Sequence, residues 1–231
     1  MVLIVDCYLD EAGGTGNFAR QLGNIPWTSV RPTREKLPDI GEWSAVMITG
    51  SAACLPDRYE GNGLREGWTI ELIAWIRKVV DADIPVLGVC FGHQIIGAAF
   101  GGGVRKADVP EVGFQRIHVV GSDPLLDGLR PSFLCFVSHE DEISEAGGLD
   151  VLAYSDACAI HAVRVPNRKV WGVQFHTEML PEEAISVLEY RMHRHPELPI
   201  DRDAELRKRE DSPSLAPILF GRFLELAGCI G

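Results

Sequence analysis

One stretch of the chain decides its fold, Ile84-Pro85-Val86-Leu87-Gly88-Val89-Cys90-Phe91-Gly92-His93-Gln94. Its first half is an apolar run typical of a buried strand, and the run stops at a cysteine flanked by glycines. The apolar and small residues Ile95–Phe100 follow at once and predict a buried helix. The stretch therefore predicts a strand, a sharp turn and a helix, with Cys90 at the turn in the G-x-nucleophile-x-G pattern.

The position of Cys90 favours reactive chemistry. A turn of this kind forces its central residue into a strained backbone conformation, and Gly88 and Gly92 let neighbouring backbone come close. The start of the helix lies beside the sulfur, where its dipole and free N–H groups favour the thiolate. One of these N–H groups, from Phe91, can face a developing oxyanion. Taken alone, the pattern also fits a structural cysteine buried at a strand end.

A candidate base lies in a second stretch, Trp171-Gly172-Val173-Gln174-Phe175-His176-Thr177-Glu178. In extended chain, residues two apart point to the same side, so Glu178 can hold one imidazole nitrogen of His176 while the other faces a thiol. This is the nucleophile, base and orienting group of a catalytic triad, in the order Cys90, His176, Glu178. For the H-x-E pattern by itself, a strand-end histidine with an exposed glutamate is the better interpretation.

Outward from these two stretches, apolar runs alternate with helix-like segments. Strand and helix alternation predicts βαβ units, hence an α/β fold with a doubly wound, mostly parallel central sheet and helices on both faces. The mostly strand-like region Val112–Val165 predicts a few antiparallel strands. The predicted strands are Val2–Val5, Ala45–Thr49, Val86–Val89, Phe133–Ser138, Ala159–Val163 and Val170–Phe175, and the other predicted helices are Asn17–Leu22, Thr69–Val80, Pro181–Arg194 and Ile218–Leu226.

The length of 231 residues suits one domain, residues 1–231, because no flexible linker divides the chain. A charged stretch, about 193–214, is interpreted as a solvated surface excursion, with a partner-docking element as the alternative. A final docking helix is expected at about 215–228.

Charge and cysteine usage exclude several classes of protein. The net charge of −11, from 22 basic and 33 acidic residues, disfavours binding to nucleic acid. No apolar run is long enough to cross a bilayer, and Val2–Val5 meets Asp6 too soon for a signal peptide. The six cysteines form no C-x-x-C pair, which argues against a zinc site or a disulfide scaffold. We therefore expect reduced thiols and a cytoplasmic protein that binds no membrane.

Together, Cys90-Phe91-Gly92-His93-Gln94 and Gln174-Phe175-His176-Thr177-Glu178 resemble the class I glutamine amidotransferases, in their free-standing, GMP synthase-like form. That family carries a G-x-C-x-G-x-Q turn and a Q-F-H-P-E segment on a flavodoxin-like fold. The resemblance covers roughly residues 1–190 by element order, and the last apolar helix also fits. Thr177 stands where the family usually has proline, which should loosen the turn between base and carboxylate slightly.

The resemblance implies further site residues. Ile48-Thr49-Gly50-Ser51 resembles the oxyanion loop, so Gly50 or Ser51 would supply a second backbone N–H beside that of Phe91. Gln94 would lie near the amide end of the substrate. The substrate-binding set also includes Ser138, His139 and Glu140, in a segment whose backbone would hold the amino-acid head of glutamine.

The resemblance also bears on cofactors. Glu111-Val112-Gly113-Phe114 is similar to a family segment that precedes a strand near the pocket, and no chemistry is assigned to it. His139, Glu140 and Asp141 offer metal-binding groups, but the sequence shows no second ligand cluster, so no metal is expected. The proposed chemistry needs no organic cofactor either.

The implied activity is hydrolysis of the γ-amide of glutamine through a thioester on Cys90. The chain has no G-x-x-x-x-G-K-[ST] loop or other nucleotide fingerprint, so the nitrogen would pass to an acceptor handled by a separate synthetase or acceptor-activating partner, in a biosynthetic pathway. Two alternatives stay open: a self-sufficient γ-glutamyl hydrolase or peptidase acting on γ-glutamyl conjugates, and a non-catalytic regulatory protein on the same fold. A DJ-1-like protein would share the cysteine turn but not Gln94 together with the H-x-E segment.

Overall fold

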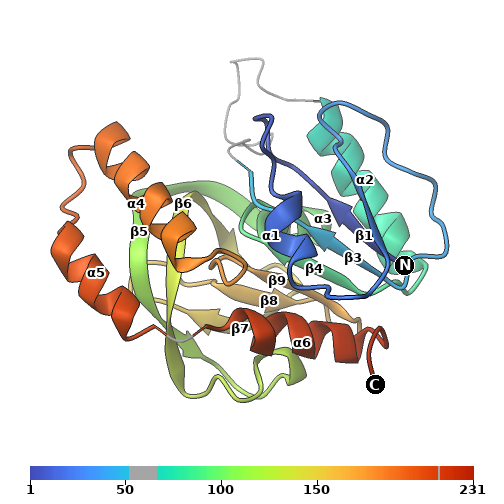
Figure 1. Ribbon diagram of the computed structural model, residues 1–231. Helices are drawn as coiled ribbons and strands as arrows, with labels where there is room; N and C mark the ends of the chain where they lie inside the picture. Colours follow the sequence, from blue (N-terminus) through green and yellow to red (C-terminus); the bar gives the residue numbers. More distant parts are fainter. Residues whose placement is uncertain (52–66, 213) are drawn as a thin grey trace.

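A nine-stranded sheet runs through the part of the chain that the computed structural model describes, residues 1–51, 67–212 and 214–231 (Figure 1). The strand order is β2-β1-β3-β4-β9-β8-β7-β5-β6. The strands are β1 (Val2–Val5), β2 (Trp27–Val30), β3 (Ala45–Ile48), β4 (Val86–Val89), β5 (Gly103–Val119), β6 (Ser132–Glu145), β7 (Asp150–Tyr154), β8 (Ala162–Arg164) and β9 (Val170–Val173).

Two kinds of pairing meet at β9. Strands β2, β1, β3, β4 and β9 pair in parallel, whereas β9, β8, β7, β5 and β6 pair antiparallel. The predicted α/β class with a parallel central region is confirmed. The antiparallel part is larger than a few added strands, since it supplies half of the pairings among the described strands.

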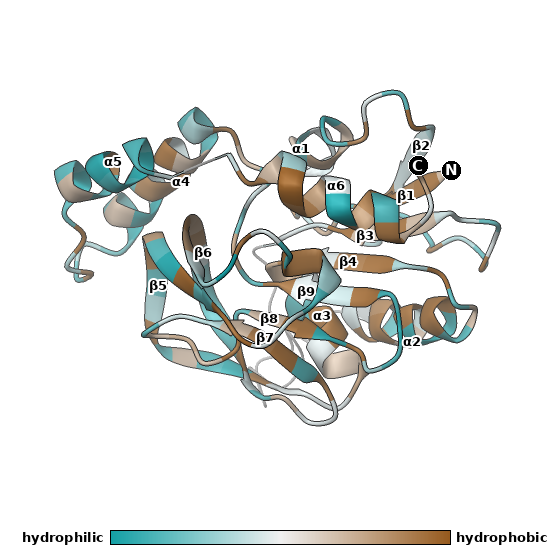
Figure 2. Cartoon of the chain, turned by 90° about the horizontal axis from the view of Figure 1, so that it is seen from below, coloured by the Kyte–Doolittle hydropathy of each residue, from teal (hydrophilic) through white to brown (hydrophobic). Residues whose placement is uncertain are grey.

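Helices cover both faces of the parallel region, as the apolar runs predict. Within β1, Val2 and Ile4 face the core layer formed with α1 and α6, while Leu3 and Val5 face the layer formed with α2 and α3. This two-sided burial explains why the inner strands are apolar throughout, and Figure 2 shows β4 largely brown. The helices are α1 (Thr15–Ala19), α2 (Gly67–Asp81), α3 (Phe91–Ala99), α4 (Pro181–Arg194), α5 (Arg202–Glu210) and α6 (Ala216–Leu226), with a 3-10 turn η2 (Pro124–Leu126).

The β5–β6 ribbon with α4 and α5 forms a second region, on the opposite side of the molecule from α2 (Figure 1). A small core joins Val112, Phe114 and Phe136 of the ribbon to Ala184 and Leu188 of α4. Helix α5 is largely hydrophilic in Figure 2. It is nevertheless anchored, because its buried Glu205 accepts a hydrogen bond from the backbone N–H of Phe114. The charged stretch thus contains a packed helix; Pro213 within it lies outside the described residues.

Several element boundaries differ from those predicted. The predicted strand Phe133–Ser138 lies in the first half of β6, which runs on to Glu145 because β5 pairs along its length. The predicted strand Ala159–Val163 starts only at Ala162, as β8. The edge strand β2 was not predicted, because Trp27 and Ser29 face solvent and leave no apolar run. The bounds of these strands depend on the strands with which they pair, and those partners are distant in the sequence.

The described cysteines are free thiols. Cys54 lies outside the described residues. Across residues 1–51, 67–212 and 214–231, no helix combines the length and the apolarity needed to span a membrane.

The glycines around the turn between β4 and α3 allow a close approach that a side chain would prevent. A Cβ on Gly92 would lie 2.6 Å from the carbonyl oxygen of Ile48 on the neighbouring strand. We expect Gly92→Ala to lower the free energy of unfolding by about 3 kcal/mol, because backbone must shift to admit the methyl group. Denaturation by urea measures the change.

Gly221→Ala is the matched control for that substitution. Gly221 lies within α6, and a Cβ there meets nothing within 4 Å. Helix propensity predicts that this variant gains about 0.5–1 kcal/mol. If Gly92→Ala were as stable as the unchanged protein, this result would contradict the close packing of the turn against β3.

Candidate active site

The candidate site lies where four neighbouring parallel strands end. Strands β1, β3, β4 and β9 are adjacent in the sheet and run in the same direction. Their carboxyl ends lead into Tyr8, Gly50, Cys90 and His176 respectively. Open α/β sheets bind ligands at this edge, because loops from adjacent strands converge there. The sheet order thus brings together residues that are far apart in the sequence.

Cys90 holds the strained conformation expected from the sequence. Its φ is 53° and its ψ is −102°, in a region that residues with a Cβ rarely adopt. Its N–H donates to the carbonyl of Val173 on β9 at 2.8 Å, and Phe91 starts helix α3 immediately after it. The thiol donates to the carbonyl of Ser138 at 3.9 Å. These contacts hold the sulfur between the start of α3, β9 and β6.

His176 and Glu178 form a buried pair against Cys90. The imidazole Nδ1 lies 2.7 Å from Oε1 of Glu178, and both side chains are buried. Burial alone would lower the pKa of His176, but the charges and hydrogen bonds of Glu178 and Cys90 outweigh it and raise this pKa well above its usual value. With Nδ1 bound to the carboxylate, Nε2 is left for the thiol. The arrangement can deprotonate a cysteine and hold the resulting imidazolium.

The loop after β3 lies beside these groups. A Cβ on Gly50 would come within 3.5 Å of Cε1 of His176 and 3.7 Å of Cβ of Cys90. Thr49 fixes the loop: its hydroxyl donates to the Gly50 carbonyl at 2.9 Å, and its own carbonyl accepts from the Gly92 N–H at 3.2 Å. Phe91 is the first residue of α3, where an N–H has no acceptor within the helix. The structure therefore brings two of the three expected oxyanion residues, Gly50 and Phe91, next to Cys90, with Ser51 following directly in the chain.

The expected substrate-binding side chains are mostly engaged elsewhere. Gln94 is buried, and its amide donates to the carbonyl of Asp141 at 2.8 Å, which ties α3 to β6. His139 bonds to Glu111, and Glu140 forms an ion pair with Arg191 at 2.7 Å. These contacts point to structural roles for the three side chains and leave the backbone of the segment, which includes the Ser138 carbonyl near Cys90, for contact with a substrate.

Tyr8 is a site residue that sequence reasoning missed. Its hydroxyl would lie 3.3 Å from a Cβ on Gly50. Burial, followed by the nearby charges of Glu178 and Cys90, raises the pKa of this phenol, so it stays a neutral donor. The buried carboxylate of Asp6 orders the loop by accepting from the N–H of Tyr8 at 3.1 Å. The signal that could have found it is its place just past the end of the first parallel strand.

A second cluster of titratable side chains corrects the expectation that His139 has no further ligand groups around it. Glu111, His139, Cys158 and His161 are all buried, and one ligand atom from each lies within 4.8 Å of all the others. Glu111 lies within β5, paired with His139 on β6, rather than ahead of a strand. The sequence could not show this, because the cluster depends on the pairing of β5 with β6 and on the fold of the β7–β8 connection.

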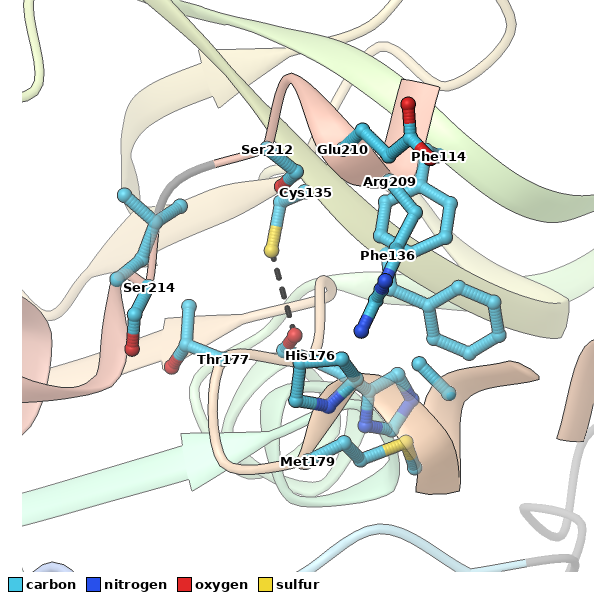
Figure 3. Close-up of a pocket in the computed structure, with 13 residues that line it drawn as sticks. Phe114, Cys135, Phe136, His176, Thr177, Met179, Arg209, Glu210, Ser212 and Ser214 are labelled. Atoms are coloured by element: carbon cyan, nitrogen blue, oxygen red, sulfur yellow. Dashed lines mark hydrogen bonds between the residues drawn. The ribbon is translucent and has the colours of Figure 1, made fainter. Parts of the chain in front are cut away.

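A cavity of about 340 Å³ adjoins the backbone side of the base (Figure 3). Its lining includes His176 and Thr177, with Arg209 from α5, and does not include Cys90 or Glu178 among the described residues. In Figure 3 the thiol of Cys135 donates to the His176 carbonyl, at 3.3 Å. The cavity therefore borders the segment that carries the base and not the thiol itself.

Comparisons with known proteins identify the family to which this chain belongs. The model of the family described as "Glutamine amidotransferase class-I" matches residues 61–192, more than half of the chain. One of the subunits of the glutamine-hydrolysing GMP synthase of Methanococcus maripaludis is 39% identical over 101 residues, which are 43% of this chain and 53% of that protein. The GMP synthase of Clostridium novyi is 31% identical over 157 residues, 67% of this chain and 27% of that protein. The chain thus spans about half the length of the first of these relatives and less of the second.

Solved structures show the same fold. A glutamine amidotransferase from Thermotoga maritima superposes with a TM-score of 0.75 at 20% identity, covering 98% of this chain and 96% of that one. One from Methylobacillus flagellatus gives a TM-score of 0.75 at 23% identity, covering 97% and 94%. These likenesses show the fold, and the family model identifies the family. The chain belongs to the class-I glutamine amidotransferase family.

Proposed function

We propose that this protein hydrolyses the side-chain amide of glutamine through a thioester on Cys90. The observation that carries the proposal is the strained cysteine at the start of α3, set against a buried imidazole whose other nitrogen lies 2.7 Å from a carboxylate. A thiol, a base and an orienting carboxylate are the groups that acyl transfer needs. The raised pKa of His176 supports a thiolate–imidazolium pair.

The steps follow from the groups present. The Cys90 thiolate attacks the γ-carbonyl carbon, and the oxyanion is held by the N–H groups of Phe91 and of Gly50 or Ser51. Removal of one such donor from an enzyme of this kind costs about 3 kcal/mol. His176 gives its proton to the amide nitrogen, the carbon–nitrogen bond breaks, and ammonia departs as the thioester forms. His176 then takes a proton from water, whose attack breaks the carbon–sulfur bond and releases glutamate.

The ammonia, in this proposal, passes to an acceptor that a separate protein activates. The relatives named above are GMP synthases, and the Methanococcus maripaludis protein is named as one of the subunits of its enzyme, which implies at least one other. The sequence of this chain carries no G-x-x-x-x-G-K-[ST] loop for a nucleotide that could activate an acceptor. In this proposal a partner synthetase therefore uses the ammonia that this protein releases.

A substrate panel tests the proposal. The pure protein, alone or with a candidate synthetase partner, is incubated with glutamine and with γ-glutamyl amides of larger amines. The glutamate released in each case is measured. We expect turnover of glutamine, raised when the partner is present. Turnover of the larger amides without turnover of glutamine would make the protein a γ-glutamyl hydrolase. No glutamate from any of them, with the partner present, would overturn the proposed activity.

The Tyr8 hydroxyl is expected to contribute to this reaction. Tyr8→Phe should lower kcat/KM for glutamine about 3- to 10-fold, the usual worth of one neutral hydrogen bond. Steady-state kinetics measures the change. Tyr154→Phe is the control, because Tyr154 is exposed and stacks on His118 away from the site. Equal kinetics for the Tyr8 and Tyr154 variants would remove Tyr8 from the site.

A further inference from the structure

The buried cluster of Glu111, His139, Cys158 and His161 has the composition and spacing of a metal site. Nε2 of His139 and Nε2 of His161 lie 3.0 Å and 2.8 Å from the same oxygen of Glu111. The Cys158 thiol completes a set of four atoms that all lie within 4.8 Å of one another. In a tetrahedral zinc site, ligand atoms are spaced by about 3.3–3.7 Å, so shifts of roughly 1 Å or less would bring all four around one ion.

The hydrogen bonds of His139 indicate that a cation or an extra proton lies between its Nε2 and the Glu111 carboxylate. Nδ1 of His139 lies 3.1 Å from the backbone carbonyl of Asp141, which can only accept, so Nδ1 carries the hydrogen. In a neutral imidazole Nε2 then presents a lone pair, and it faces the lone pairs of the Glu111 carboxylate. A positive centre between the two atoms resolves this conflict. In metal sites, a histidine ligand commonly donates the N–H of its other ring nitrogen to a backbone carbonyl or a carboxylate.

The charges of the four ligands match a divalent ion. One thiolate, one carboxylate and two neutral imidazoles around a divalent ion have no net charge, which suits a fully buried site.

We propose that Glu111, His139, Cys158 and His161 bind one divalent transition-metal ion, zinc by its ligand chemistry, in a closed structural site. Nitrogen, sulfur and carboxylate ligands in a set of four are those that zinc takes in proteins. On binding, the Cys158 thiol releases its proton to solvent and its sulfur bonds to the ion. A surface pocket of about 380 Å³ has Glu111, one of the four proposed ligands, in its lining.

The site would connect three parts of the antiparallel region. Glu111 lies on β5, His139 lies on β6, and Cys158 and His161 lie in the connection between β7 and β8. His139 directly follows Ser138, whose carbonyl accepts from the Cys90 thiol. An ion here would hold the strand beside the nucleophile without touching the reacting atoms. The expected consequence is a rise in thermal stability, with a smaller effect on turnover.

Metal content and a spectrum test the proposal on the full chain. Protein made with added zinc is dialysed against a weak chelator, and we expect about one equivalent of zinc by elemental analysis. Protein freed of metal and titrated with Co²⁺ should show tetrahedral cobalt bands and a sulfur-to-cobalt charge-transfer band. Cys158→Ser should abolish the charge-transfer band, and His161→Gln should lower metal affinity at least about 10-fold.

Controls separate the site from adventitious binding and from misfolding. Cys229→Ser removes a partly exposed thiol outside the cluster and should leave the cobalt spectrum unchanged. Circular dichroism shows whether each variant is folded, and the titration of the unchanged protein does not depend on any variant. If the unchanged protein holds no zinc and gives no tetrahedral cobalt spectrum, a proton rather than a metal fills the cluster, and the proposal is wrong.

Discussion

Replacement of Cys90 by alanine is expected to lower glutaminase turnover about 10⁶-fold. The thioester cannot form without the sulfur, and no other described cysteine lies against His176 in the same way: Cys135 contacts only its backbone carbonyl. Release of glutamate measures the loss. Intact mass after treatment with an electrophilic glutamine analogue should show one adduct on the unchanged protein and none on the variant.

Two further variants sharpen this prediction. Cys7→Ala removes another buried thiol and should keep both the adduct and the activity. Cys90→Gly should be as inactive as Cys90→Ala but more stable by about 1 kcal/mol, because glycine relieves the strain at φ 53°. An adduct that persists in Cys90→Ala would assign the nucleophile to another residue. Equal stability of the alanine and glycine variants would argue against strain at this turn.

Glu178→Gln is expected to lower kcat about 10³- to 10⁴-fold while leaving the fold intact. The amide keeps the size of the side chain but removes the charge that lies 2.7 Å from Nδ1 of His176. That charge is one of the contributions that raise the pKa of His176. In the variant this pKa therefore falls, and the imidazolium loses its proton at a lower pH. Steady-state kinetics and an NMR titration of the His176 ring measure the two effects.

Glu182→Gln is the control for the loss of one negative charge near this segment. Glu182 lies at the exposed start of α4, four residues further along the chain, and pairs loosely with Arg209 at 3.5 Å. We expect its kinetics and the His176 titration to match those of the unchanged protein. If Glu178→Gln left the pKa of His176 in place, the carboxylate would not be the orienting group.

The elements that sequence reasoning found are those whose signals are local. Strand β4 and helix α4 have the predicted bounds, because a compact apolar run and a proline at the helix start need no distant partner to be visible. The edge strand β2 has no such signal, and the length of β6 is set by its pairing with β5. The packed helix α5 was hidden by its charge, since the residue that anchors it is a buried glutamate.

For the candidate site the same division holds. The turn at Cys90 and the spacing of His176 and Glu178 were readable because each is formed by residues within a few positions of one another. Tyr8 and the ligand cluster around Glu111 were not readable, because the order of strands in the sheet decides which chain segments meet. The sequence by itself determined the turn at Cys90 and the spacing that pairs His176 with Glu178. Only the tertiary structure decided what surrounds them, since contacts between distant segments arise from strand pairing and shared burial, which no local pattern encodes.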